Sequence, residues 1–576
     1  MLTKITIRNF KRLGEVEIEL GNPVVFIGPN NSGKTSAMQA LALWDIGLQR
    51  WNEKRLGKNA QGKRPGVTVN RRDLVAIPVP AAKLLWRGLH VRDTRQVAGQ
   101  QQTSNVRIEI IVEGTTKDQQ WFCGLEFDYA NPESFYCRPL RCDSGPRMTI
   151  PPDAGTVQIA FLPPMSGLAA TETRLDEGAM NVRVGEGRTA EVLRNLCYQV
   201  QNKWPDKWEK ITSEIRHLFG VALGKPRYVP ERGEITMSYR EQDVELDLSS
   251  SGRGLQQTLL LLAYMYANPG AVLLLDEPDA HLEVLRQRQT YKLIADVAAD
   301  SGSQIIAASH SEVLLNEAAD RDLVIAFIGK PHPLADRKSQ LLKALRETGF
   351  EQYSQAEQTG WVLYLEGSTD LAILQAFARR LKHEATEALR KPFVHYVGNQ
   401  PKKAANHYHG LREALPDLRG VAILDRLESD PPEMQPVTLL LWRKREIENY
   451  LCTRATLEAY VAASTRTDFP GPLFVQNETS ERMDAMRESI DEITRAMETL
   501  GTGSPWDADT RVSGDFLTPL FRTYSRKLGV PDLMAKKSFY ELAEHVPEGE
   551  IDPEIREKLD AIVRTANSAT PRGNED

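Results

Sequence analysis

Cysteine is scarce in this chain, and no two cysteines stand in a recognisable metal-binding pair. The 576 residues include five scattered cysteines, none in a Cys-x-x-Cys arrangement: Cys123, Cys137, Cys142, Cys197 and Cys452. Zinc fingers and disulfide frameworks both depend on closely or regularly spaced cysteines, so neither is expected here. This cysteine usage is typical of a protein kept in a reducing cytosol.

The sequence also lacks an uninterrupted apolar run. Residues 1–8 alternate like a β-strand and have no apolar core of the kind that signal peptides carry. The most apolar stretch, 258–275, is broken by Asn268-Pro269-Gly270, which predicts a helix, a turn and a buried strand. We therefore expect a cytoplasmic protein without a membrane segment or a membrane partner.

Neither sign of charge dominates the chain. Its 72 Lys and Arg and 78 Asp and Glu give a net charge of −6, so binding to nucleic acid would have to come from a local patch. Hydrophobic residues make up 41% and charged residues 26%, the composition of an ordinary globular protein. The chain is too long for one core, so two or three domains are expected.

A phosphate-binding loop pattern stands near the start of the chain. Gly28-Pro-Asn-Asn-Ser-Gly-Lys-Thr35 lies between an apolar strand and a helix that begins near Gly33. Its glycines let backbone N–H groups close around phosphates, Lys34 is expected to reach the β- and γ-phosphates, and Thr35 to bind Mg²⁺. A turn that merely opens a helix is the alternative. The predicted ATP-binding residues of the loop are Asn30, Asn31, Ser32, Gly33, Lys34, Thr35 and Ser36.

Two later apolar strands end in polar residues, as expected of ligand-binding strands in α/β sheets. Residues 272–275 lead to Asp276 and Glu277, and 304–308 lead to Ser309 and His310. We predict that Asp276 holds Mg²⁺ through water, that Glu277 polarises the attacking water, and that His310 contacts the γ-phosphate. The acids could instead cap the next helix, and a lone histidine is often structural.

Between the loop and these strands, Leu248-Ser-Ser-Ser-Gly-Arg-Gly254 opens a long apolar helix. Small residues at a helix N-terminus form an anion site, although such a turn is also a common helix start. In this order, the four elements resemble the heads of ABC-type ATPases, including SMC-like repair ATPases. The segment before the turn has no heptads, which disfavours the branch with a long coiled coil. The resemblance implies that one copy's signature residues complete a partner's ATP site in a homodimer or a higher oligomer: Ser250, Ser251, Gly252 and Arg253.

After a polar stretch at 352–359, strand and helix patterns alternate again. The alternation predicts strands at 361–365, 393–397 and 421–424, with helices at 370–381 and 403–414 between them. Strands that alternate with helices predict a parallel sheet, so this part is expected to be a second, smaller α/β domain.

Acidic residues follow two strands of this second sheet. Glu366 comes after the first strand, with Asp370 four residues later, and Asp425 comes after the last. Because parallel strands end at the same edge, Glu366 and Asp425 could share one divalent cation, Mg²⁺ or Mn²⁺. Such a pair can activate water beside a phosphodiester. Two acids that cap helices are an equally good interpretation of these residues alone.

Glu366-Gly-Ser-Thr-Asp370, Asp425, Arg445-Glu-Ile-Glu-Asn-Tyr450 and Lys536-Lys-Ser-Phe539 together resemble a TOPRIM domain. They are most similar to the TOPRIM half of the OLD (overcoming lysogenization defect) family, which includes the Gabija-type anti-phage nucleases. The resemblance implies the following roles: Glu366 as metal ligand or base, Asp370 as its support, Asp425 as the principal metal ligand, Glu448 as a second-site acid, and Lys537 or Lys536 at the scissile phosphate.

One position departs from that family. The usual Asp-x-Asp has Leu427 in its third position, so either Glu428 or Asp430 substitutes for the missing acid or the second metal is held weakly. The departure puts catalytic competence in doubt more than the fold.

These observations together predict an α/β chain with an ABC-type ATPase head at 1–350, a TOPRIM-like parallel α/β domain at 358–565 and a disordered tail at 566–576. A basic insertion is expected at 50–105, either as a mobile loop or along a nucleic-acid backbone. Its cations include Arg50, Lys54, Arg55, Lys58, Lys63, Arg64, Arg71 and Arg72.

The resemblance implies an ATP-regulated, Mg²⁺-dependent nuclease in bacterial anti-phage defence. DNA is the favoured substrate, and RNA such as tRNA is an alternative. In a further alternative the TOPRIM domain is degenerate, and the ATPase acts as a sensor or scaffold that regulates a partner defence protein.

Overall fold

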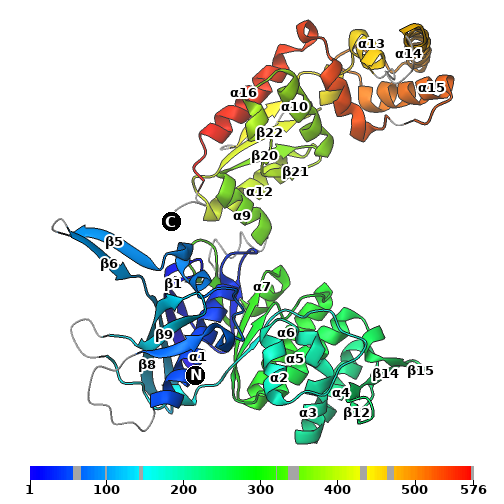
Figure 1. Cartoon of the computed structure of the whole chain (residues 1–576). Helices are drawn as coiled ribbons and strands as arrows, with labels where there is room; N and C mark the ends of the chain where they lie inside the picture. The colour runs from blue at the N-terminus through cyan, green and yellow to red at the C-terminus, as the bar shows by residue number, and fades with distance from the viewer. Residues whose placement is uncertain are drawn as a thin grey trace. The chain divides into compact units, whose positions relative to one another are not determined.

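A computed structural model describes residues 1–55, 66–97, 100–141, 147–319, 321–334, 349–428, 437–463, 472–532 and 534–571. The chain divides into two units, Met1–Leu342 (unit 1) and Lys343–Asp576 (unit 2), and each contains helices and sheets (Figure 1). The chain is therefore a mixed α/β protein, as predicted. Within the described ranges, no helix is long and apolar enough to cross a membrane.

An antiparallel sheet in unit 1 has the strand order β2-β1-β7-β8-β9-β4. Alternate residues of β7 are buried because one face of the sheet packs against helix α1 (Lys34–Arg55). The indole Nε1 of Trp44 in α1 donates to the carbonyl of Cys123 at 2.9 Å, which fixes the helix on the sheet. The strands are β1 (Leu2–Phe10), β2 (Leu13–Glu19), β4 (Val67–Asn70), β7 (Ile108–Thr116), β8 (Gln119–Asn131) and β9 (Ser134–Pro139), with β5 (Arg92–Val97) and β6 (Gln100–Asn105) as a separate hairpin.

The second sheet of unit 1 has the order β10-β16-β17-β3-β18-β19 and is parallel except for its last pair. Both β16 and β17 are buried throughout, as parallel strands covered on two faces usually are. Since the strands run parallel, the carboxyl ends of β3, β16 and β17 lie at one edge, called the nucleotide edge below. The strands are β3 (Val24–Ile27), β10 (Ile159–Leu162), β16 (Val272–Asp276), β17 (Gln304–Ser309), β18 (Leu323–Ala326) and β19 (His332–Pro333).

A largely helical part of unit 1 packs around α5 (Arg253–Ala267), whose residues 255–266 are all buried. A helix that is apolar on all sides is a core helix, and its neighbours supply the cover. These neighbours are α3 (Leu193–Lys203), α4 (Pro205–Phe219) and α6 (Val284–Ser301). Unit 1 also contains α2 (Glu177–Gly185), α7 (Glu312–Ala318) and the short strands β11 (Ala222–Leu223), β12 (Arg227–Val229), β13 (Glu234–Thr236), β14 (Ser238–Glu241) and β15 (Val244–Asp247).

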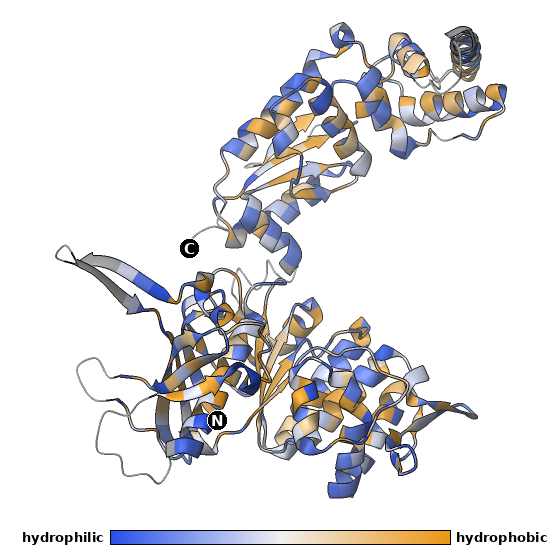
Figure 2. Ribbon diagram, viewed as in Figure 1, coloured by the Kyte–Doolittle hydropathy of each residue, from blue (hydrophilic) through white to orange (hydrophobic). Residues whose placement is uncertain are grey.

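Unit 2 is built on a four-stranded sheet in the order β21-β20-β22-β23, and all three pairs are parallel, as predicted. Figure 2 shows hydrophobic residues gathered along the strands and hydrophilic residues on the outer helical faces. The strands are β20 (Trp361–Leu365), β21 (Val394–Tyr396), β22 (Arg419–Leu424) and β23 (Thr438–Leu441). The helices are α9 (Phe350–Thr359), α10 (Ser368–Arg380), α11 (Ala385–Ala388), α12 (Pro401–Ala414), α13 (Arg454–Ala463), α14 (Pro472–Leu500), α15 (Thr518–Leu528) and α16 (Pro553–Asn567), with 3₁₀ helices at η7 (Ile447–Tyr450) and η9 (Lys536–His545).

Two distant segments of unit 2 meet beside the start of its sheet. Gly360, just before β20, has a φ of 71°, and a Cβ at this position would lie 2.9 Å from the carbonyl carbon of Thr570. Only glycine fits such an approach at this backbone conformation. The segment after α16 therefore returns to the amino end of β20, whereas Glu366 follows the carboxyl end of that strand.

The basic stretch 50–105 is not the exposed insertion that its composition predicts. Residues 67–70 form β4 and pair with β9, and Trp86 is only 1% exposed, packed edge-on against Tyr129 and Phe135. The prediction is wrong because apolar residues such as Val69 alternate with the cations and enter the core, while Arg72 stays exposed. Lys58, Lys63 and Arg64 lie outside the described residues.

Two smaller predictions are also corrected. The polar stretch 352–359, after which the alternating pattern was predicted to begin, is itself part of helix α9. The predicted tail at 566–576 is partly ordered, because α16 continues to Asn567 and Ala569 packs against the core of unit 2. Residues 572–576 lie outside the described residues.

Candidate functional site

The P-loop joins β3 to α1 through a tight turn that requires its glycines. Gly33 has a φ of 108°, a conformation that L side chains rarely adopt. A Cβ on Gly28 would lie 2.8 Å from the carbonyl oxygen of Phe327, so the loop passes close to β18. Asn31 also has a left-handed φ of 62°, which asparagine tolerates better than most residues. The predicted loop thus has the backbone that a phosphate cradle needs.

Two buried polar side chains of the loop fit a phosphate ligand. Lys34 is 5% exposed, and its ammonium donates to the carbonyls of Gly28 and Pro29 at 2.8 Å each. Burial lowers the pKa of Lys34, and the nearby acids Glu277 and Asp276 oppose this shift. The buried hydroxyl of Ser32 has no hydrogen-bond partner among the residues that the structure describes. A phosphate oxygen would satisfy that hydroxyl.

The predicted Mg²⁺ residues of unit 1 meet across the nucleotide edge. The hydroxyl of Thr35 donates to Asp276 at 2.9 Å, so the first turn of α1 contacts the end of β16. Burial raises the pKa of Asp276 to about 6, and the Thr35 hydrogen bond works against this. A hydroxyl beside a buried carboxylate is a donor set that suits Mg²⁺.

Glu277 and His310 form a pair on the neighbouring strand ends. Their side chains lie 3.2 Å apart, from His310 Nδ1 to Glu277 Oε1. This hydrogen bond lowers the pKa of Glu277 and raises that of His310. Glu277 has a left-handed φ of 50°, and its N–H donates to the carbonyl of Ala308 at 2.8 Å. The histidine therefore favours an ionised Glu277, the form that can polarise water.

The predicted signature residues form a short turn in front of α5. Ser251 is buried and donates its hydroxyl to the carbonyl of Leu248 at 2.7 Å. Ser250, Gly252 and Arg253 are exposed at the start of the helix. Exposed residues in this position are accessible to another molecule.

Helix α5 also contacts the nucleotide edge from within the same chain. The side-chain amide of Gln257 donates to the carbonyl of Pro278 at 3.3 Å, directly after Asp276 and Glu277. Sequence patterns could not reveal this contact, because it joins two residues that belong to separate motifs.

Unit 2 contains an open cavity of about 330 Å³ at the carboxyl edge of its sheet. Glu366 and Asp425 both line it, directly after the adjacent parallel strands β20 and β22. The remaining lining residues are Asn399, Arg426, Leu427, Glu428, Arg445, Glu446, Arg511 and Lys536. The predicted convergence of the two strand ends therefore occurs.

The electrostatics of this cavity disfavour additional negative charge. Burial raises the pKa of Asp425 to about 9, and the charges of Glu366, Asp370 and Glu448 add to the effect. Burial also raises the pKa of Asp370 to about 6 and that of Glu448 to about 7. Acids that cannot all ionise together indicate a place where a cation would be stabilised.

Asp370 and Glu448, the other two acids with raised pKa values, lie outside the cavity lining and contact protein groups. Asp370 accepts a hydrogen bond from the backbone N–H of Glu366 at 3.0 Å, which fixes the turn that carries Glu366. Glu448 lies 3.5 Å from the ammonium of Lys536. Neither acid lines the cavity.

Of the two predicted lysines, Lys536 lines the cavity and Lys537 does not. Both are exposed, but the ammonium of Lys536 is 3.4 Å from the hydroxyl of Ser513 and 3.5 Å from Glu448. The motif contains adjacent lysines, and only the packing of η9 decides which of them faces inward.

Glu428 is a poor substitute for the acid that Leu427 replaces. It is exposed and accepts a hydrogen bond from Arg445 at 2.8 Å, which lowers its pKa. Asp430 lies outside the described residues. In the part of the chain that the structure describes, no three or more His, Cys, Asp or Glu side chains are arranged to hold a metal ion. The five predicted metal ligands of unit 2 therefore do not form one cluster: Glu366, Asp425 and the exposed Glu428 line the cavity, and Asp370 and Glu448 do not.

Asn399 is a cavity residue that the sequence interpretation missed. It follows β21, on the other side of β20, and the N–H of Gly398 donates to the carbonyl of Glu366 at 3.1 Å. The amide oxygen of Asn399 is buried and accepts no hydrogen bond from any described residue. Asn399 has a left-handed φ of 45°, a conformation that asparagine adopts more readily than most residues. Because parallel strands end at the same edge of a sheet, the residues after the strand at 393–397 could have been predicted to lie near Glu366 and Asp425.

Comparisons with known proteins match two segments of unit 1. Residues 1–44 match a family model described as "AAA ATPase domain". Residues 197–316 match one described as "AAA domain, putative AbiEii toxin, Type IV TA system". The first segment contains the P-loop, and the second contains the signature turn, Asp276, Glu277 and His310. Unit 1 therefore carries AAA-type ATPase domains.

Similar solved structures are ATPase heads of low sequence identity. The Smc head domain with an extended coiled coil, bound to the C-terminal domain of ScpA derived from Pyrococcus furiosus, is 15% identical over 58% of this chain and 96% of that chain, with a TM-score of 0.33. The SMC head domain from Thermotoga maritima is 14% identical over 58% of this chain and 99% of that chain, with a TM-score of 0.29. The recombination mediator protein RecF-ATPrS of the RecFOR pathway is 12% identical over 58% of this chain and 98% of that chain, with a TM-score of 0.30. No curated protein sequence matches the chain.

Proposed function

We propose that the chain is an ATPase whose second unit is a Mg²⁺- or Mn²⁺-dependent nuclease. The observation that carries the nuclease half is the convergence of Glu366 and Asp425, from adjacent parallel strands, on one cavity. Their position after β20 and β22 is also the position of the motif acids in the TOPRIM domains that unit 2 resembles. The two family matches lie within residues 1–316, so the proposal for unit 2 rests on its own residues.

In the ATPase half, each residue has a separate task. Lys34 and the loop N–H groups bind the phosphates, and Thr35 and Asp276 hold Mg²⁺, which neutralises charge on the phosphates. Glu277 accepts a proton from the attacking water, and His310 keeps Glu277 ionised and faces the γ-phosphate. Ser250 to Arg253 contact the ATP of a second copy, so that hydrolysis takes place in a homodimer.

In the nuclease half, Glu366 and Asp425 would hold the cation. Mg²⁺ usually binds through one or two carboxylates and keeps several waters, so a pair of acids is sufficient. The bound cation supplies an activated water and neutralises the phosphodiester. Asp425 would hold the cation as a carboxylate, Asn399 would offer a neutral oxygen from the same cavity, and Lys536 would face the scissile phosphate.

Nucleic acid, with DNA favoured over RNA, is the proposed substrate, and defence against phage is the proposed setting. The three arginines of the cavity lining, Arg426, Arg445 and Arg511, suit a phosphate backbone.

A sensor or scaffold is the second candidate. Leu427 in place of an acid and the engagement of Glu428 by Arg445 favour it, since both weaken a second metal position. In this version the ATPase regulates a partner defence protein, and the cavity binds a cation without cutting.

The test is a cleavage assay on the full chain, with plasmid DNA and total RNA side by side, Mg²⁺ or Mn²⁺, and with or without ATP. Wild type should cut one of the two, and Asp425→Ala should reduce cutting by about 10²-fold or more. Glu387→Gln, which alters an acid that is 84% exposed in unit 2, is the matched control and should cut like wild type. Cutting that survives in Asp425→Ala would refute the site. Cation binding without cutting would support the scaffold.

A further inference from the structure

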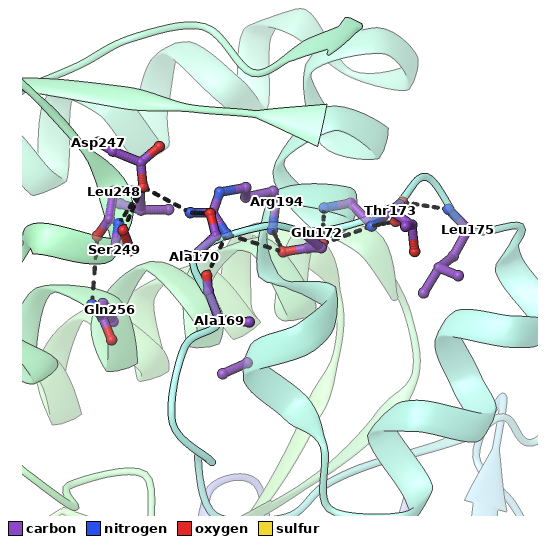
Figure 3. Close-up of polar contacts among 12 residues, drawn as sticks. Ala169, Ala170, Glu172, Thr173, Leu175, Arg194, Asp247, Leu248, Ser249 and Gln256 are labelled. Carbon is purple, nitrogen blue, oxygen red and sulfur yellow. Dashed lines mark hydrogen bonds and ion pairs between the residues drawn. The ribbon is translucent and has the colours of Figure 1, made fainter. Parts of the chain in front are cut away.

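The signature turn is attached to a buried arginine that belongs to none of the motifs. Arg194, in the first turn of α3, is 1% exposed. An arginine is almost never this buried unless its guanidinium is fully paired. Its Nη1 donates to the carbonyl of Ala169 at 3.0 Å, and its Nη2 donates to Ala170 at 3.3 Å and to the carboxylate of Asp247 at 2.9 Å (Figure 3).

Glu172 fixes the other end of this cluster, as Figure 3 shows. Its carboxylate accepts from the backbone N–H groups of Arg194 at 2.9 Å and Asn195 at 2.7 Å, which are free donors at a helix start. The side-chain amide of Asn195 also donates to Glu172 at 2.7 Å, and its oxygen accepts from Leu175 at 2.8 Å. Residues 169–175 are thereby held against the N-terminus of α3.

Asp247 is the residue that shapes the signature turn. Its carboxylate accepts from both the N–H and the hydroxyl of Ser249, at 2.8 and 2.6 Å. Burial works to raise the pKa of Asp247, but the hydrogen bonds from Ser249 and the charge of Arg194 together lower it. Gln256 closes the turn onto α5 by donating to the carbonyl of Ser251 at 2.9 Å. One carboxylate therefore serves both the turn and the arginine.

The segment on the other side of Arg194 comes directly from the nucleotide edge. Strand β10 pairs in parallel with β16, with Leu162 opposite Leu275, so it ends beside Asp276. Residues 163–172 continue from there to the carbonyls that Arg194 binds. A change at the nucleotide edge thus has a short covalent and hydrogen-bonded route to the signature turn.

We propose that Arg194 is a positioning residue that couples residues 163–172, at the nucleotide edge, to the signature turn, and so sets the affinity of one copy of this chain for the ATP-loaded site of a second copy. The inference rests on the ATP-sandwiched homodimer of the proposed function. Arg194 touches neither ATP nor the second copy.

The arrangement requires arginine and not simply a positive charge. Three acceptors on two chain segments are bound from two nitrogens of one planar group. Lysine ends in a single ammonium nitrogen and has no planar guanidinium, so it cannot bind all three acceptors in the same geometry. Arg194→Lys should therefore keep the charge and lose most of the coupling.

The experiment uses the full chain with Glu277→Gln added, so that bound ATP persists. The affinity for ATP is measured at low protein concentration, and dimer formation is measured by sedimentation with and without ATP. Asp247→Ala, at a side chain that is 47% exposed, removes the turn contact without opening the core. Asp247→Ala and Arg194→Lys should bind ATP within about twofold of the parent and weaken the ATP-dependent dimer about tenfold or more.

Asp300→Ala is the matched control, because it removes another exposed carboxylate of unit 1, which pairs with Lys207 and Lys210. It should dimerise like the parent. Equal dimer affinity in the parent and in Asp247→Ala would overturn the inference and leave the proposed function intact. A parent that binds ATP and stays monomeric would overturn both. Turnover by Arg194→Lys without Glu277→Gln should recover as protein concentration rises, which a merely misfolded variant would not do.

Discussion

Asp425 is surrounded by groups that oppose its ionisation, and this has a measurable thermodynamic consequence. Its pKa is raised to about 9 by burial and by the charge of Glu366, against about 3.9 in an unfolded chain. Between these values the folded chain holds a proton that the unfolded chain has released. Stability should therefore fall as the pH rises from about 4 towards about 9, and a divalent cation should restore it, most of all at high pH.

Asp425→Asn should separate stability from catalysis. The amide cannot ionise, so we expect a rise in the Tm of unit 2 of about 2–4 °C at pH 8 without metal, which corresponds to about 1 kcal/mol. Cleavage should be lost. Thermal unfolding of wild type and variant at pH 6 and pH 8, with and without Mn²⁺, measures both effects. A variant that is less stable than wild type at pH 8 would contradict the assigned repulsion.

Asn399 provides a second prediction at the residue scale. Asn399→Gly keeps the left-handed backbone and removes the amide, so the affinity for Mn²⁺ should fall about tenfold with little change in Tm. Asn399→Asp restores an oxygen and should bind at least as tightly as wild type. Calorimetric titration measures both, and Gln400→Ala, at the exposed neighbour, is the control. Unchanged affinity in Asn399→Gly would remove Asn399 from the cation site.

Among single residues, the sequence could predict those that a strand end or a glycine turn places. Lys34, Asp276, Glu366 and Asp425 are such residues, because chain direction alone brings strand ends to one edge. The choice of Lys536 over Lys537 could not be predicted, since it depends on how η9 packs. The cluster around Arg194 could not be predicted either, because it joins residues from 169 to 247 that share no periodic pattern.

Whole elements were predicted where apolar periodicity was strong and missed where charge concealed it. The alternating strands and helices of unit 2 have the predicted order and direction. Strand β4 and the residues up to Trp86 were missed because cations are interspersed among their apolar positions. Helix α9 was missed because few of its ten residues are apolar. Composition describes the average of a stretch, whereas packing selects individual side chains.

Trp86→Ala tests whether residues 67–89 belong to the core. The indole is 1% exposed and donates to the carbonyl of Val106 at 2.8 Å, so its removal should cost about 3–5 kcal/mol of stability. Leu84→Ala, at a side chain that is 36% exposed, should cost less than about 1 kcal/mol. Urea unfolding of the full chain measures both. A small effect at Trp86 would mean that this stretch is the peripheral insertion that its charge suggests.

The whole molecule consists of two units with separate cores, so each should unfold on its own account. A fragment of residues 349–571 should unfold cooperatively and gain Tm on addition of Mn²⁺, with no response to ATP. Calorimetry of the fragment and of the full chain provides the comparison. A fragment without a cooperative transition would mean that unit 2 needs unit 1 to fold, and the metal response would then have to be measured in the full chain.

The contact between Gly360 and Thr570 makes unit 2 a nearly closed loop of chain, with both joints at the amino end of β20. A peptide that spans helix α9 (Phe350–Thr359), from residue 571 back to residue 349, would close the fragment into a circle. The same geometry recommends the segment after Thr570 for a fluorophore or an affinity handle, because the chain there is a full strand length away from the carboxylates that a substrate would approach.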